Sequence, residues 1–512
     1  MYEHPSQSPE HLPAGMTRRW QELCERYFPV APDGSIWRFS RRAAPRDPEQ
    51  GWKLHLSATV LTACEVLVQV APLLRRRGTL FKAPTSLLEV QQINSGLYYG
   101  YSQVGKIITV YPESPKAAVG LAQRLYELTG PVQAPTVPFD LKFRPDGCVY
   151  YRYGAFRPAE VENQDGTRTR AIRDPRGRLV PDRRDDAAAK PDWVTNPFPV
   201  PEPSGAAVPD DSPLKTTYKA FQALTQRGRG GVYKALDLSV APPRLCILKE
   251  GRRGGELSWD GRDGAWRIRN EERVITSLRA AGVDAPRAYA SFTVEANHYL
   301  VTEFVEGETL QSYLLRRKRR LTVPRSLRLG AELSQLLAGV HAAGWAWRDL
   351  KPGNVMLTKT GALRPLDFEG SCPLDRPDAM PWGTPGFAPP ARRSADESRG
   401  YEDLYALGAF LHLLLTGRLP EPSSPRVTAE LRRGVPPEAC RLVAELLTAN
   451  PRLQPPAHEV ARRLLAIGAN RRRVSTGRKR HAGGCSGSLR RRASSSKRGS
   501  ERRLSKAGST VR

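Results

Sequence analysis

Three polar side chains at fixed spacing in the second half of the chain have the chemistry that phosphoryl transfer needs. The run from Trp347 to Asn354 reads Trp-Arg-Asp-Leu-Lys-Pro-Gly-Asn, and Asp367 opens the triplet Asp-Phe-Glu thirteen residues later. The reaction requires a carboxylate that orients the acceptor hydroxyl, and oxygen ligands that hold Mg²⁺ on the nucleotide. We predict that Asp349 is the catalytic base and that Asn354 and Asp367 bind Mg²⁺. Lys351 adds charge near the transferred phosphate and favours a protein or peptide substrate.

A glycine-rich turn precedes this region. The run from Gly228 to Lys234 lies between apolar segments and predicts a hairpin whose amides cover the phosphates of ATP or GTP, with Gly228, Gly230 and Gly231 in contact with the nucleotide. If Val232 fills the usual valine position, Gly230 is the one glycine kept of the usual three. The loop is then expected to hold phosphate partly through Arg227 or Arg229.

Two charged residues follow in the order that a protein kinase uses. Lys249 ends a predicted strand, where it would touch the α and β phosphates. Glu271 begins a segment whose apolar residues recur at the spacing of one helix face, and it is the expected partner of Lys249. The alternative is that both are ordinary surface charges.

The segment from Tyr299 to Val305 predicts a strand that leads into an adenine-binding hinge. Thr302 would guard the back of the pocket, and Glu303 and Val305 would offer backbone groups to the base.

Several positions depart from the usual kinase pattern. Trp347 replaces a histidine, Ala391 replaces the glutamate that follows the run from Gly383 to Pro390, and Gln454 replaces the arginine that would pair with that glutamate. Loss of both halves of a buried ion pair can be nearly neutral, whereas loss of one half is costly, so we still expect a folded lobe. Asp403 is expected to anchor the catalytic-loop backbone.

The first two hundred residues carry cations on predicted strands. In Lys53-Leu54-His55-Leu56 the polar residues share one strand face and the leucines the other. Further strands each place one cation among apolar or aromatic neighbours, namely Lys82, Lys106 and Arg152. Several cations on β-strands suggest an anion pocket.

Together these motifs make the chain resemble class III, or the related class IV, lanthipeptide synthetases. The likeness is carried by Trp52 to Thr59, Phe81-Lys82, Gly105 to Pro112, Tyr151 to Phe156 and the Asp-Phe-Glu triplet, and it covers roughly residues 20 to 465. The resemblance implies a kinase that phosphorylates Ser/Thr of a precursor peptide. It also implies a phosphoserine/phosphothreonine lyase that removes the phosphate to leave dehydroalanine or dehydrobutyrine.

The resemblance also implies roles for the cations. Lys82, with a pKa lowered by positive neighbours and apolar walls, would abstract the α-proton, and His55 would protonate the leaving phosphate. Lys106 and Arg152 would bind the phosphate, with Lys142 and Arg144 as weaker candidates. The alternative is that His55 is a satisfied core histidine and Lys82 a solvated lysine.

We expect an α+β protein. Residues 20–160 form the lyase-like domain, residues 161–213 a linker and strap, residues 214–467 a bilobal Ser/Thr protein-kinase-like domain, and residues 468–512 a disordered basic tail. The formal charge of +28 is uneven, because residues 471–512 hold 15 Lys and Arg against the single acid Glu501. No aromatic residue interleaves these cations, which makes a nucleic-acid partner unlikely on chemical grounds.

Composition also restricts compartment and cofactors. The amino terminus has no secretory signal, and the apolar run Leu404 to Leu415 is too short to cross a bilayer, so a cytoplasmic protein without membrane contact is expected. The seven cysteines are dispersed and predict no metal knuckle.

The family's zinc cyclase is not expected in this chain, because only His481 and Cys485 follow Leu465 as ligand types. Cyclisation by a separate protein, a product left linear, and a frame-shifted tail are the competing explanations. Two other functions stay open: a Ser/Thr kinase of cellular proteins whose amino-terminal domain only binds phosphosites, and a pseudokinase scaffold.

Overall fold

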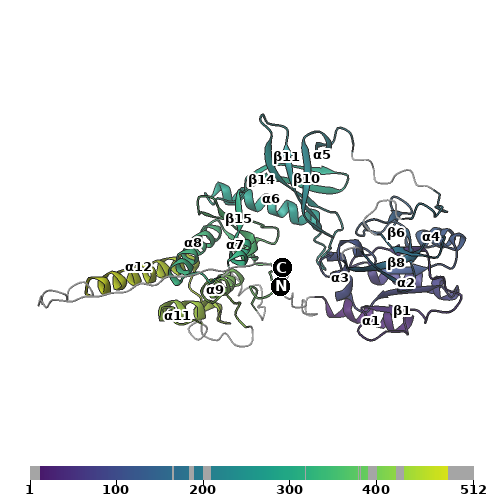
Figure 1. The fold of residues 1–512 in the computed structure, drawn as a ribbon, viewed down its shortest axis with the longest axis horizontal. Helices are drawn as coiled ribbons and strands as arrows, with labels where there is room; N and C mark the ends of the chain where they lie inside the picture. Colours follow the sequence, from purple (N-terminus) through teal and green to yellow (C-terminus); the bar gives the residue numbers. More distant parts are fainter. Residues whose placement is uncertain are drawn as a thin grey trace, which may run out of the picture.

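The computed structural model describes residues 12–163, 166–183, 190–199, 209–317, 319–378, 380, 382–389, 400–421 and 432–481, the last eleven by their backbone alone. Figure 1 shows the amino-terminal domain with α1 to α4 at one end of the long axis, beside an upper lobe of strands. A helical lobe lies below these strands, on the side away from the amino-terminal domain (Figure 1).

In the described residues, the amino-terminal domain is built on one antiparallel sheet of six strands in the order β1-β3-β4-β2-β6-β5. The strands are β1 (Trp37–Phe39), β2 (Gln50–Leu56), β3 (Leu80–Pro84), β4 (Ile108–Tyr111), β5 (Leu141–Lys142) and β6 (Val149–Ala155). The helices are α1 (Ala14–Tyr27), α2 (Ala63–Arg76), α3 (Leu87–Ser95) and α4 (Pro115–Thr129), with a 3-10 turn η2 (Tyr101–Gln103). The hydroxyls of Ser86 and Ser114 cap α3 and α4 by accepting hydrogen bonds from amides of the first turn.

Alternation along the strands gives this sheet one apolar and one polar face. On β2, Leu54 belongs to the buried core that α1, α2 and α4 complete, while His55 points to the other side. His55 pairs with Thr109 of β4, and Thr109 pairs with Lys82 of β3. These three side chains therefore share the polar face.

The segment predicted as a linker and strap packs on this domain. Its described part, with the residue that precedes it, forms three short strands, β7 (Glu160–Glu162), β8 (Arg168–Arg173) and β9 (Leu179–Pro181). Farther along, Phe198 is 3% exposed and stacks on Tyr151 with ring centroids 3.8 Å apart. The segment is therefore a strap whose aromatic end completes the apolar core.

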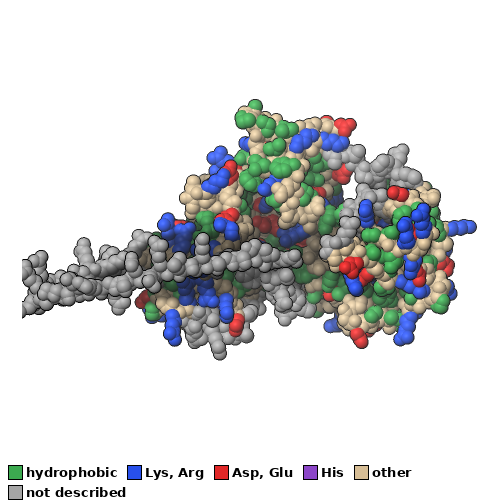
Figure 2. Space-filling view, viewed as in Figure 1, with side chains coloured by type: hydrophobic (Ala, Val, Ile, Leu, Met, Phe, Trp, Pro, Cys, Tyr) green, Lys and Arg blue, Asp and Glu red, His purple; other side chains and the backbone are tan. Residues whose placement is uncertain are grey.

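The upper lobe is an antiparallel sheet of five described strands in the order β10-β11-β12-β14-β13. They are β10 (Tyr218–Arg227), β11 (Gly230–Asp237), β12 (Arg244–Gly251), β13 (Ala288–Val294) and β14 (Asn297–Glu303), preceded by α5 (Pro213–Thr216). Helix α6 (Gly264–Ala280) packs against β12 and β14, and the Asp263 carboxylate caps its first turn. Hydrophobic side chains gather on the outer surface of β10 and β11, where Phe221 is 59% exposed (Figure 2).

The lower lobe is mainly helical. It contains α7 (Leu310–Arg316), α8 (Val323–Ala342), α9 (Tyr401–Thr416), α11 (Pro437–Leu446) and α12 (Ala457–His481). Short strands support the catalytic segments, namely β15 (Gly307–Thr309), β16 (Trp345–Ala346), β17 (Val355–Thr358), β18 (Leu363–Pro365) and β19 (Cys372–Pro373), with the 3-10 turns η3 (Pro352–Asn354) and η5 (Pro451–Leu453). Helix α9 is buried along nearly its whole length, which explains its apolar sequence without a membrane. No helix among the described residues combines the length and apolarity needed to span a bilayer.

The predicted boundary of the tail needs correction. Disorder was expected from residue 468, but α12 continues through His481. Its first turns pack on α8 through Val460 and Leu464, and a helix that is already nucleated extends at little further cost. The rest of the predicted tail, with Cys485, lies outside the described residues.

The kinase glycine-rich turn lies against the amino-terminal domain. The Gly228 amide donates to the Ser95 carbonyl with an N to O distance of 3.0 Å. The Arg252 guanidinium donates to the Tyr101 hydroxyl and lies over the Tyr101 ring. Trp259 packs against the apolar core of the amino-terminal domain. The two domains therefore meet at the loop that should cover the nucleotide.

Replacement of Phe198 by alanine should destabilise the amino-terminal domain, because it leaves a cavity beside Tyr151. The expected loss is about 3–5 kcal/mol of unfolding free energy, measured by denaturant titration with tryptophan fluorescence. Phe221→Ala is the matched control, since that ring is exposed and its loss should change stability by less than about 0.5 kcal/mol. Equal effects of the two substitutions would show that the strap is not part of the core.

Candidate active sites

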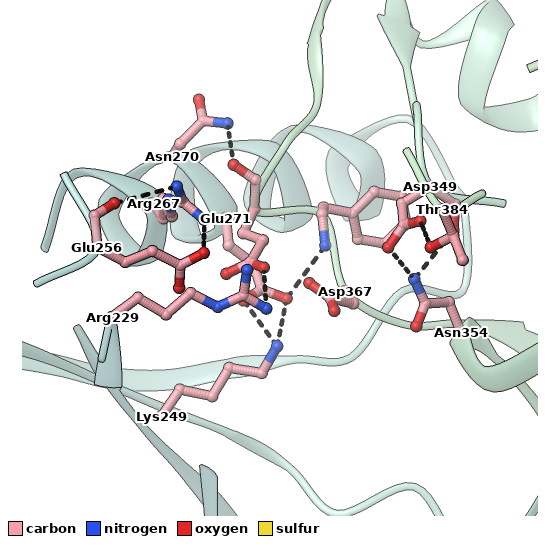
Figure 3. A network of polar contacts seen from close by, with 12 residues as sticks. Arg229, Lys249, Glu256, Arg267, Asn270, Glu271, Asp349, Asn354, Asp367 and Thr384 are labelled. Carbon is pink, nitrogen blue, oxygen red and sulfur yellow. Dashed lines mark hydrogen bonds and ion pairs between the residues drawn. The ribbon is translucent and has the colours of Figure 1, made fainter. Parts of the chain in front are cut away.

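In the upper lobe, the predicted lysine and glutamate, Lys249 and Glu271, form an ion pair. The Lys249 ammonium lies 2.7 Å from both carboxylate oxygens of Glu271. Lys249 comes from β12 and Glu271 from the second turn of α6, so the contact joins sheet and helix (Figure 3). Glu271 also accepts a hydrogen bond from the Phe368 amide at 3.3 Å, which ties α6 to the Asp-Phe-Glu segment.

Asp349 is fixed from three sides. Its carboxylate accepts hydrogen bonds from Lys351 at 2.7 Å, from the Thr384 hydroxyl at 2.8 Å and from the Asn354 amide nitrogen at 2.9 Å. Burial raises the pKa of Asp349, and Asp367 adds to this while Lys351 opposes it. A carboxylate with a raised pKa is a stronger proton acceptor while it stays ionised. Thr384 lies in the run from Gly383 to Pro390, and nothing in the sequence marks it as a partner of Asp349.

Asp367 faces a cluster of cations (Figure 3). Burial by itself would raise the pKa of Asp367, but the charges of Lys249, Arg229 and Lys351 hold it below its ordinary value. Asp367 is therefore an ionised carboxylate inside this cluster, and its role as a Mg²⁺ ligand stays a prediction. Asn354 commits its amide nitrogen to Asp349, which leaves the amide oxygen for a cation. These donors fit Mg²⁺, which prefers carboxylate and carbonyl oxygens.

Asp403 anchors the catalytic loop as expected. It is fully buried, and its two oxygens accept the Trp347 amide at 2.8 Å and the Arg348 amide at 2.6 Å. Trp347 keeps the packing role of the histidine that it replaces, because its ring stacks on Phe368 and its indole donates to the Asp367 carbonyl. These contacts hold Arg348 and Asp367 at positive φ, which is uncommon for residues with side chains.

The positions of the missing ion pair are only partly described. Gln454 is buried and its amide nitrogen donates to the Leu446 carbonyl, so this side chain replaces an arginine without leaving a charge. Ala391 lies outside the described residues.

The predicted hinge follows β14. Thr302 is buried at the back of this strand, and Val305 is also buried. The Glu303 carboxylate binds the guanidinium of Arg364 at 2.6 Å, so this side chain supports the hinge and does not enter the base pocket. The predicted contacts of the Glu303 and Val305 backbone with adenine stay predictions.

The glycine-rich turn needs its glycines because there is no room for a side chain at these positions. A Cβ at Gly228 would come within 1.7 Å of the Asn94 carbonyl oxygen, and one at Gly230 within 1.8 Å of the Glu250 oxygen. A Cβ at Gly231 would meet the Tyr233 ring at 2.5 Å. These glycines therefore allow close packing of the turn, and their contact with nucleotide stays a prediction.

In the amino-terminal domain, the predicted cations gather around a carboxylate that sequence reasoning missed. Asp140 accepts from His55 Nδ1 at 2.5 Å and lies 2.8 Å from Lys106 Nζ and 3.9 Å from Arg152 Nε. Its side chain has no solvent exposure. Burial by itself would raise the pKa of Asp140, but Lys106, the hydrogen bond from His55 and Arg152 hold it well below its ordinary value. His55, Lys106 and Arg152 thus form one site.

The cation cluster extends along β6 and β2. Arg152 also binds Asp182 of the strap, with its Nη2 at 2.7 Å from the carboxylate. Lys53, which had been noted on the polar face without a role, pairs in register with Arg152 and is 7% exposed. Buried cations need counter-ions, and Asp140 and Asp182 supply them for Lys106 and Arg152.

Lys82 lies on the same sheet face as His55, two strands away. Its ammonium sits 3.9 Å from the centre of the Trp37 ring, and Phe39 lies on the far side at 6.0 Å. A contact of this kind stabilises the ammonium form of a lysine, and the role of Lys82 as a base stays a prediction. The two weaker candidates bind elsewhere, Lys142 to the Pro145 carbonyl and Arg144 to the Gln123 side chain.

Comparison with known proteins gives two domain matches and several relatives. Residues 26–209 match the RamC amino-terminal domain, and residues 257–478 match the protein kinase domain. A probable SapB synthase of Streptomyces coelicolor is 32% identical over 394 residues, which are 74% of this chain. The resemblance to class III lanthipeptide synthetases is confirmed. The predicted α+β order, a RamC-type domain followed by a kinase domain, is confirmed as well.

The part of the chain that matches the protein kinase domain is also similar to serine/threonine-protein kinases. PksC of Streptomyces coelicolor is 32% identical over 186 residues, 32% of this chain and 34% of the relative. PknA of Mycobacterium tuberculosis is 28% identical over 259 residues, 47% of this chain and 58% of the relative. These relatives support kinase activity. The chain spans only 41% of the SapB synthase relative.

Asp403→Asn should weaken the kinase domain. The backbone amides of Trp347 and Arg348 each donate to a different carboxylate oxygen, and the side-chain NH₂ of asparagine cannot accept one of these two hydrogen bonds. We expect a loss of about 1–3 kcal/mol in unfolding free energy together with loss of phosphorylation, measured by denaturant titration and by phosphate incorporation. Asp375→Asn, at a side chain that is 80% exposed, should change neither. Unchanged stability in Asp403→Asn would contradict the anchoring role.

Proposed function

We propose that this protein dehydrates Ser and Thr residues of a ribosomally made precursor peptide in two steps, phosphorylation and then elimination of phosphate. The observation that carries the proposal is that one chain combines a kinase centre with a buried group of cations organised by Asp140. The likeness to a probable SapB synthase supports a peptide substrate. The nucleotide substrate is ATP or GTP.

In the first step, Asp349 accepts the proton of the peptide hydroxyl as its oxygen attacks the γ-phosphorus. Lys351, which contacts both Asp349 and Thr384, stabilises the negative charge on the transferred group. Mg²⁺ bound by Asn354 and Asp367 would neutralise the charge of the nucleotide phosphates. Lys249, held by Glu271, would position those phosphates.

In the second step, Lys82 takes the α-proton of the phosphorylated residue. The electron pair forms the Cα to Cβ double bond, the bond from Cβ to the phosphate oxygen breaks, and His55 gives that oxygen a proton. Lys106 and Arg152 hold the departing phosphate by charge-assisted hydrogen bonds. The products are a dehydroalanine or dehydrobutyrine residue and inorganic phosphate.

The surroundings of His55 explain how substrate prepares the acid. Burial lowers the pKa of His55, and Asp140 only partly opposes this, so the ring is neutral in the site as described. A phosphate dianion beside Lys106 and Arg152 brings negative charge to the ring and raises its pKa. Asp140 binds Nδ1, which leaves Nε2 as the nitrogen that takes up the proton. His55 therefore gains its catalytic proton when substrate binds.

Lys82→Ala should stop the reaction at the phosphopeptide. With precursor peptide, nucleotide and Mg²⁺, mass spectrometry should show gain of phosphate without loss of water, because elimination slows about 10²–10⁴-fold without its base. Lys142→Ala, which removes a lysine bound to the Pro145 carbonyl, should still dehydrate the peptide. Dehydration by Lys82→Ala would refute the base assignment. If the unaltered protein phosphorylates the peptide and never eliminates phosphate, the function is that of a kinase with a phosphosite-binding domain.

Asp349→Asn should block phosphorylation and leave elimination of phosphate intact. Unphosphorylated peptide should remain unchanged, because the amide cannot accept the hydroxyl proton and the transfer slows about 10²–10⁴-fold. A chemically phosphorylated peptide should still lose its phosphate, since the cations of the other domain are untouched. Both reactions are read as mass changes, and retained phosphorylation would exclude Asp349 as the base.

A further inference from the structure

An arginine of the glycine-rich turn reaches the kinase centre. Arg229 lies between β10 and β11, and its Nη2 is 2.7 Å from the carboxylate of Glu369. The two side chains are 25% and 11% exposed. In Figure 3 the Arg229 guanidinium lies in the same cluster as Lys249, Glu271 and Asp367. A cation therefore occupies the region between the glycine-rich turn and the metal ligand.

Both partners of this contact belong to departures from the usual kinase pattern. Glu369 stands where the Asp-Phe-Gly triplet has glycine, and Arg229 belongs to a turn that keeps one of three usual glycines. The Asn270 amide fixes the Glu369 backbone by donating to its carbonyl at 3.1 Å. The pair is therefore built into α6, the turn and the Asp-Phe-Glu segment together.

The turn has lost part of the usual means of holding phosphate. The Gly228 amide donates to Ser95 of the amino-terminal domain, so it is not directed at a nucleotide. The Arg229 carbonyl accepts from the Arg252 amide at 2.8 Å, which ties the backbone of the turn to the residue that follows β12. A side-chain cation can replace what the backbone no longer offers.

We propose that Arg229 is a phosphate ligand of the nucleotide and that Glu369 is its resting counter-ion, which a nucleotide phosphate displaces. The inference rests on the proposed kinase step. The partly buried guanidinium of Arg229 then stays paired at every stage, since one anion exchanges for another.

The surroundings of Glu369 allow that exchange. Arg267 of α6 also acts on Glu369 and remains as a second cation. The released side chain therefore stays close to a cation.

Arg227, the other cation considered for this role, is turned elsewhere. Its charge acts on the Tyr98 hydroxyl of the amino-terminal domain, where it counters the rise in pKa that burial causes. Arg229, in contrast, acts on Asp367. Substitution of Arg229 and substitution of Arg227 should therefore have different effects on nucleotide binding.

The test is binding of Mg·ATP and of adenosine to the full-length protein, measured by isothermal titration calorimetry without peptide. Arg229→Ala should weaken Mg·ATP binding about 10- to 100-fold, the range for loss of a charge-assisted contact, and should leave adenosine binding within about twofold. Arg229→Lys should give an intermediate value, because it keeps the charge and loses the planar fork. Arg227→Ala should bind Mg·ATP within about twofold of the unaltered protein.

Glu369→Gln distinguishes between two roles of this carboxylate, a counter-ion that the nucleotide displaces and a group that only stabilises the fold. Removal of the competing carboxylate should tighten Mg·ATP binding. If Glu369→Gln weakens binding as Arg229→Ala does, or if Arg229→Ala weakens adenosine equally, the pair is structural and the inference is overturned. Normal Mg·ATP binding by Arg229→Ala also overturns it while leaving the kinase proposal intact. Failure of the unaltered protein to bind Mg·ATP would instead overturn both.

Discussion

Buried charges must be paired, and this constraint organises both halves of the molecule. In the amino-terminal domain, three cationic or titratable side chains from separate segments meet at one carboxylate, that of Asp140. In the kinase domain, Asp367 and Glu271 balance Lys249, and Glu369 balances Arg229. An unpaired ion at either place would cost several kcal/mol, so the positions of the strands and loops that carry these groups are tightly linked.

Much of the kinase centre could be predicted because its signals are local. The run from Trp347 to Asn354 places Asp349 and Asn354 five residues apart on one loop, and the structure closes this loop with a hydrogen bond between them. The contacts of Lys249 with Glu271 and of Asp403 with the catalytic loop also form as predicted, since each follows from a strand or helix whose period is evident in the sequence.

Features that depend on distant segments could not be predicted from the sequence. Asp140 stands in the short run Pro138-Phe139-Asp140-Leu141, and nothing local marks it as the partner of a histidine 85 residues earlier. The signal for Asp140 is indirect: the sequence predicts a set of cations in an anion pocket and names no counter-ion for them. Phe198 lies in a segment with little hydrophobic period, so its place in the core depended on tertiary packing, and the extension of α12 depended on its docking to α8.

The hydrogen bond between Gly228 and Ser95 affects how genetic experiments on this protein must be interpreted. Ser95 follows Asn94, whose side chain binds the Ala58 carbonyl and the Gly105 amide, one residue before Lys106. A lesion that disturbs this stretch of the amino-terminal domain is therefore expected to shift the glycine-rich turn of the kinase domain as well. Reduced phosphorylation in such a mutant would therefore be poor evidence that the amino-terminal domain contributes groups to phosphoryl transfer.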